Sequence, residues 1–69
     1  MDSNYIINRL KSTLFKYPTV DVLRNRLKNL DEKKRNSIVS NLKIEMYKHT
    51  NSDIQEPLVE LLYKMPLAS

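Results

Sequence analysis

The chain has 69 residues with no Cys and one His, so it cannot form a disulfide or a Cys-based zinc site, and one His is too few to hold a metal tightly. Its length allows one domain, and a core this small leaves oligomerisation or docking on another protein as a further source of stability. Twelve Lys and Arg against eight Asp and Glu give a net charge of +4, which permits contact with nucleic acid without establishing it.

Two helices are predicted in the first half of the chain, over residues 3–16 and 19–29. Residues 2–4 offer side-chain oxygens to cap the first helix. Tyr17-Pro18 is expected to end it, because the residue before a proline is driven toward extended geometry. Thr19 is expected to cap the second helix. The residues spaced for buried faces are Ile6, Ile7, Leu10 and Leu14, then Val20, Leu23, Leu27 and Leu30.

The longest stretch without Pro predicts a third helix over residues 32–48, with Asp31 as its cap. At about 100° per residue, one side of this helix is spaced to face a core. Ile44 and Tyr47 lie on a different side, so this helix has two apolar sides. One side is expected to contact the core of the chain and the other a partner. The core-facing set is Ile38, Val39, Leu42 and Met46.

A fourth helix is predicted over residues 54–65, because Pro57 is tolerated only in a first turn. Val59 and Tyr63 lie on its flank, beside a core-facing set of Ile54, Leu58, Leu61, Leu62 and Met65. No stretch alternates with the period of two that a half-buried strand needs. The sequence therefore predicts a single all-α domain over residues 1–69, a compact bundle of four short helices.

Enzymatic activity is not expected. The chain has no Gly to build a phosphate-binding loop and no Cys nucleophile. One His–acid pair, His49 with Asp53, lies four residues apart across a predicted loop, and a helix-end His beside an N-cap Asp explains it better than catalysis does. We expect no cofactor and no metal.

Basic residues cluster where the second and third helices meet. The candidates for phosphate contacts are Arg24, Arg26, Lys28, Lys33, Lys34 and Arg35. However, the turn is short and lacks Gly, and Asp31 and Glu32 at the start of the third helix repel phosphate. Residues 9–48 are basic and the segment from His49 is acidic. A solvated helical surface explains this pattern best, and the alternatives are contact with nucleic acid or head-to-tail contact between copies.

Protein–protein interaction is the preferred interpretation. Apolar residues outside the predicted core faces mark a partner surface if they gather into one patch. The candidate interface residues are Ile44, Tyr47, Val22, Val59 and Tyr63.

Three segments carry a resemblance to a known family. Leu14–Leu23, Lys48–Ile54, and then Leu58, Leu61 and Leu62 resemble the N-terminal helical domain of TFIIS and elongin A. The resemblance covers about half of the chain. It implies a small all-α bundle of a transcription factor that binds short disordered motifs, has no catalytic activity and is located in the nucleus.

The sequence thus predicts a non-enzymatic module for protein–protein interaction or self-assembly, its partners including a second copy of the chain. The alternatives are a small basic DNA- or RNA-binding protein and a phage or viral regulator that docks on a host protein. No apolar run approaches the roughly 20 residues of a membrane span, so we expect no membrane contact and an intracellular location, the nucleus being implied by the resemblance alone.

Overall fold

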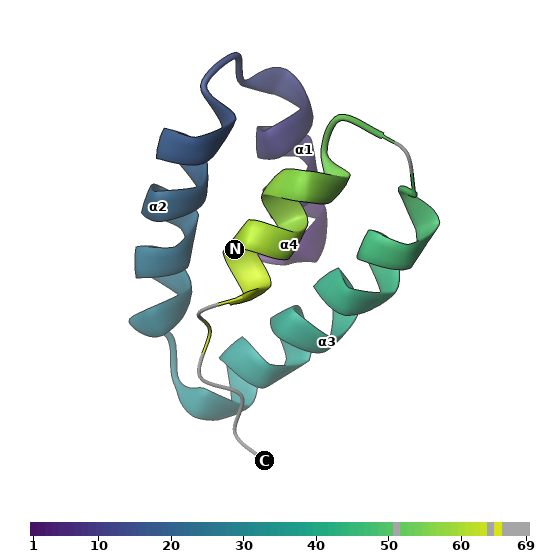
Figure 1. The fold of residues 1–69 in the computed structure, drawn as a ribbon. Coiled ribbons are helices and arrows are strands. Elements are labelled where there is room, and N and C mark those ends of the chain that lie inside the picture. The colour runs from purple at the N-terminus through teal and green to yellow at the C-terminus, as the bar shows by residue number, and fades with distance from the viewer. Residues whose placement is uncertain (51, 64, 66–69) are drawn as a thin grey trace.

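The structure, a computed structural model, describes residues 1–50, 52–63 and 65. Its helices are α1 (Ser3–Ser12), α2 (Lys16–Lys28), α3 (Glu32–Lys48) and α4 (Gln55–Tyr63), and the described residues contain no strand. α1 and α4 each pack against both α2 and α3, α4 on the near side in Figure 1 and α1 behind it. The predicted all-α bundle of four helices is confirmed.

The core lies where the four inward faces meet. All of the predicted face residues are buried or partly buried except one: Leu14, which we expected to continue the face of α1, is 92% exposed. Leu30, Met46 and Leu62 lie at the edge of the core, partly buried against it. The buried apolar residues are Ile6, Ile7, Leu10, Val20, Leu23, Leu27, Ile38, Val39, Leu42, Ile54, Leu58, Leu61 and Met65.

The first two helices have different bounds from those predicted. α1 ends at Ser12 and α2 begins at Lys16, so the prediction that Tyr17-Pro18 ends the first helix is wrong. Pro18 lies in the first turn of α2, where its missing N–H has no helical acceptor to lose. The predicted cap Thr19 lies inside α2, and the N-cap is Phe15, which makes no side-chain capping bond.

The other boundaries are close to those predicted. α3 spans the predicted residues, and Asp31 Oδ1 accepts the N–H of Lys34 at 2.8 Å, which confirms Asp31 as its cap. Asp2 caps α1 in the same way, because its Oδ1 accepts the N–H of Tyr5 at 2.9 Å. α4 begins one residue later than predicted and ends at Tyr63; Met65 is not helical, and residue 64 lies outside the described residues.

Candidate functional site

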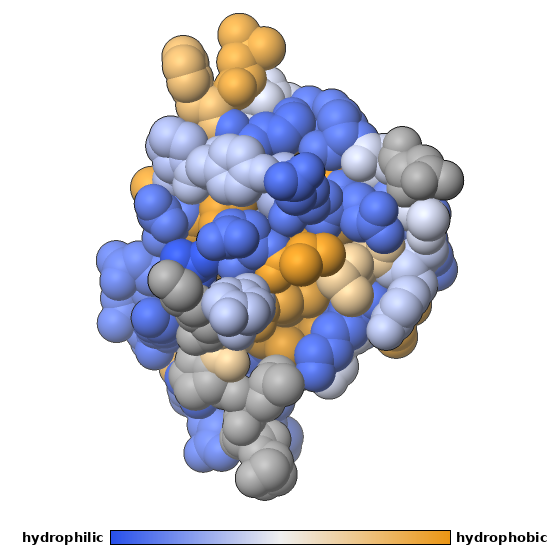
Figure 2. Space-filling model, in the orientation of Figure 1, coloured by the Kyte–Doolittle hydropathy of each residue, from blue (hydrophilic) through white to orange (hydrophobic). Residues whose placement is uncertain are grey.

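The connection between α1 and α2 carries the most exposed large apolar side chain of the described residues. Leu14 is 92% exposed and Phe15 beside it is 71% exposed. We call these two residues the apolar tip. Figure 2 shows apolar atoms projecting from the top of the molecule, where Figure 1 has the α1–α2 connection. Neither side chain has a polar group that could bond to water, so their exposure is costlier than that of an exposed Tyr.

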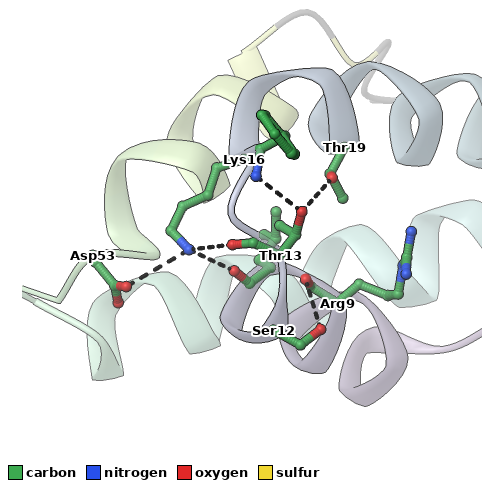
Figure 3. Close-up of polar contacts among 8 residues, drawn as sticks. Arg9, Ser12, Thr13, Lys16, Thr19 and Asp53 are labelled. Atoms are coloured by element: carbon green, nitrogen blue, oxygen red, sulfur yellow. Dashed lines mark hydrogen bonds and ion pairs between the residues drawn. The ribbon is translucent and has the colours of Figure 1, made fainter.

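The conformation of this connection begins at Thr13. Its backbone turns extended, with φ −89° and ψ 143°, which ends α1. Its Oγ1 then accepts the N–H of Phe15 at 3.1 Å, a local bond that competes with continuation of the helix. Thr19 Oγ1 donates to the same Thr13 oxygen at 3.1 Å, which ties the connection to the first turns of α2 (Figure 3).

Lys16 holds the connection from the other side. Its Nζ donates to the carbonyl oxygens of Leu10 at 2.9 Å and Thr13 at 3.1 Å (Figure 3). These carbonyls lie at the C-terminal end of α1, where a helix has no N–H groups left to satisfy them and where a cation is favoured. The same ammonium lies 3.6 Å from Asp53 Oδ2, just before α4. Lys16 therefore links α1, α2 and the start of α4.

A second long-range contact joins α2 to α4 next to the tip. Tyr17 Oη donates to Glu56 Oε1 at 2.9 Å. This hydrogen bond is the main reason that the pKa of the Tyr17 phenol is raised above its ordinary value. The apolar tip thus projects from a backbone held by Thr13, Lys16 and Tyr17, and the last two residues contact the carboxylates of Asp53 and Glu56.

The five interface residues predicted from the sequence are all exposed, but they come from three helices. Val22 is on α2, Ile44 and Tyr47 are neighbours on α3, and Val59 and Tyr63 are one turn apart on α4. The face of the molecule over α4 is largely hydrophilic, with an apolar area between α4 and α3 (Figure 2). Four of the five residues therefore form two pairs of neighbours, one pair on α3 and one on α4, and Val22 lies on α2.

The six basic candidates are divided by the structure. Arg24 turns toward α4: its Nη1 lies 3.2 Å from Asp21 Oδ1 and its Nη2 donates to the Glu60 carbonyl at 2.7 Å. Arg26 turns toward α1, where its Nη1 donates to Tyr5 Oη at 3.0 Å. Arg35 is partly buried, whereas Lys28, Lys33 and Lys34 are exposed. Two of the six therefore have protein partners on different sides of α2.

Arg26 and Tyr5 also form part of an open groove of about 550 Å³. The guanidinium carbon of Arg26 lies 6.0 Å from the centre of the Tyr5 ring, at the limit of a cation–π contact. The groove is formed where α1 begins and α2 ends, and it is lined by Met1, Tyr5, Arg26, Asn29 and Leu30. It therefore lies at the opposite end of the α1–α2 hairpin from the apolar tip.

His49 does not pair with Asp53. Its Nε2 lies 3.2 Å from Glu45 Oε2, one turn back along α3, while Asp53 pairs with Lys16. Among the described residues, no group of three or more His, Cys, Asp or Glu side chains is placed to hold a metal ion.

Hydrophobic periodicity concealed the apolar tip in the sequence, because Leu14 follows Leu10 at the spacing of a continuing buried face. Pro18 was the available signal. Its ring would clash with the carbonyl of Leu14 in a continuous helix, so a break is required upstream of it.

Among residues 1–50, 52–63 and 65, no helix combines the length and the apolar character needed to cross a membrane. No family model matches the chain, and no curated protein and no solved structure matches it significantly. The resemblance to the N-terminal domain of TFIIS and elongin A therefore stays a prediction.

Proposed function

We propose that this protein is a non-enzymatic protein-interaction module whose primary contact is the apolar tip, Leu14 and Phe15. The observation that carries the proposal is their exposure, 92% and 71%, on a connection that is held in place rather than loose. Burying an aliphatic or aromatic side chain of this kind contributes about 1.5–3 kcal/mol, so the pair can act as the anchor of an interface.

The polar contacts beneath the tip support this use. Association loses affinity when it must order flexible loops and side chains, and a backbone already fixed in its bound shape avoids most of that cost. Thr13 and Lys16 fix the backbone on both sides of the tip without covering it. Thr13 and Lys16 thus keep the backbone in one conformation, and Leu14 and Phe15 remain available for contact with a partner.

Site-specific photo-crosslinking tests the proposal. With p-benzoylphenylalanine in place of Phe15, irradiation in the cells that make the protein should give adducts with a second protein or a second copy. The same group in place of Asn41, which is exposed on α3, should not give those adducts. Leu14→Ser in the Phe15-labelled protein should reduce them.

Circular dichroism of each labelled protein shows whether it is folded. Equal adducts from positions 15 and 41, or none from a folded protein labelled at position 15, would rule out the tip as the contact.

A further inference from the structure

We infer that the partner of the apolar tip is a second copy of this chain, and that the tip of one copy enters the groove of the next. This inference rests on the proposed function and names the partner and the receiving site. The groove lined by Met1, Tyr5, Arg26, Asn29 and Leu30 is part of the described surface and is open.

The groove suits these two side chains in size and chemistry. Its volume of about 550 Å³ falls within the range of about 300–1,000 Å³ that is typical of binding pockets, so it has room for Leu14 and Phe15. Leu30 offers an aliphatic wall. The Tyr5 ring and the Arg26 guanidinium offer an aromatic face and a cation, both favourable partners for the ring of Phe15.

The borders of the two sites are complementary in charge. The residues that follow the tip, Lys16 and Tyr17, contact Asp53 and Glu56, and residues 11–21 and 52–56 together hold three acidic and two basic side chains. Around the groove, residues 1–5 and 26–35 together hold five basic and three acidic side chains. The balance there is therefore positive. Complementary charge favours this orientation and opposes contact between two tips or two grooves.

The contact has to be between molecules. The tip and the groove are separated by the 13 residues of α2, about 20 Å of helix, so a chain cannot fill its own groove with its own tip. Because the two contacting surfaces differ, the association is head-to-tail and leaves a free tip and a free groove at the ends of a dimer. A contact made by two anchor side chains is small, and we expect weak, concentration-dependent association.

One variant removes the tip and another blocks the groove, so that each side of the contact is tested by itself. Leu14→Ser with Phe15→Ser removes the tip; Phe15 is the N-cap of α2, where Ser is favoured, so the fold is retained. Asn29→Trp fills the groove from an exposed position, the C-cap of α2, whose φ of −88° and ψ of −5° lie on the right-handed side and need no glycine. Asn41→Trp adds the same side chain on α3, away from the groove, as the matched control.

Sedimentation equilibrium measures the molar mass of each protein at concentrations of about 0.02–2 mM, a range suited to weak association. The unmodified chain and Asn41→Trp should rise in mass with concentration, whereas the tip variant and Asn29→Trp should each stay monomeric. An equimolar mixture of the last two should form a dimer that grows no further, because the intact tip of one enters the intact groove of the other.

An unmodified chain that stays monomeric at about 2 mM overturns the inference. So does an Asn29→Trp chain that still associates, since the contact is then between two tips or on another surface such as Ile44 and Tyr47. A folded pair of variants that fails to combine overturns it as well. Adducts between Phe15-labelled protein and a different protein, with a monomeric unmodified chain, would overturn this inference and leave the proposed function standing.

Discussion

The two connections that flank α2 have the same length, but one exposes its apolar residues and the other packs its apolar residue against the core. Residues 13–15 join α1 to α2 and expose Leu14 and Phe15, whereas residues 29–31 join α2 to α3 and place Leu30 against the core. Length alone therefore does not decide whether a short connection buries its apolar residues.

The bonds that hold each connection account for the difference. At the α2–α3 connection they are local: the N–H of Leu30 donates to the Leu27 carbonyl at 3.2 Å, and Asp31 caps the helix that follows. The α1–α2 connection has local bonds as well, from Lys16 to the carbonyls of Leu10 and Thr13, but Lys16 and Tyr17 also reach Asp53 and Glu56 near the start of α4. Polar bonds of this kind replace an apolar anchor, and they leave the apolar side chains free for contact with another molecule.

The largest difference in the free energy of unfolding is expected between two truncations on one predicted helix face. Leu10 is fully buried and Leu14 is 92% exposed, although they are four residues apart. Leu10→Ala should lower the free energy of unfolding by about 2–5 kcal/mol because it leaves a cavity. Leu14→Ala should change it by no more than about 0.5 kcal/mol. Urea unfolding followed by circular dichroism measures both, and equal losses would mean that the tip belongs to the core.

A smaller effect is expected at the lysine that holds the tip. Lys16→Met removes two hydrogen bonds to carbonyls and should lower the free energy of unfolding by about 1–2 kcal/mol. It should also speed amide hydrogen exchange at residues 13–15, because the backbone there loses its support.

Asp53→Ala is the control for the ion pair alone. The Asp53 side chain is 78% exposed, so losing its charge should change stability little. If Asp53→Ala loosens the connection as much as Lys16→Met does, the ion pair holds it and the carbonyl bonds do not.

The smallest change in stability is expected from the loss of the Tyr17–Glu56 hydrogen bond at high pH. The hydrogen bond to Glu56 raises the pKa of Tyr17 above its ordinary value of 10.0, so the protonated phenol is favoured in the folded state. This contact therefore stabilises the fold below about pH 10, and its contribution is lost as the pH rises through the raised pKa. The melting temperature of the unmodified chain should exceed that of Tyr17→Phe at about pH 8, and the difference should shrink at about pH 11. A difference that is the same at both values would show that the phenol proton has no part in the contact.

The sequence by itself determined the class of the fold and most of its core. The 3.6-residue spacing of apolar residues, the lack of Gly and the carboxylate of Asp31 act within a few residues of one another, so they can be read without knowing what packs where. The bounds of α3 and the burial of Leu23, Leu42 and Leu58 follow from these local rules.

Only the tertiary structure decided where α1 ends and what its connection exposes. Leu14 fits a continuing helix face as well as Leu10 does, and Pro18 requires a break without fixing its position. The outcome depends on Lys16, which donates to the carbonyls of Leu10 and Thr13, and on Tyr17, which donates to Glu56. Neither contact is indicated by a periodic pattern in the sequence. The tip and the groove are likewise set at opposite ends of the hairpin by the packing of α1 on α2, and no sequence pattern shows that they are complementary.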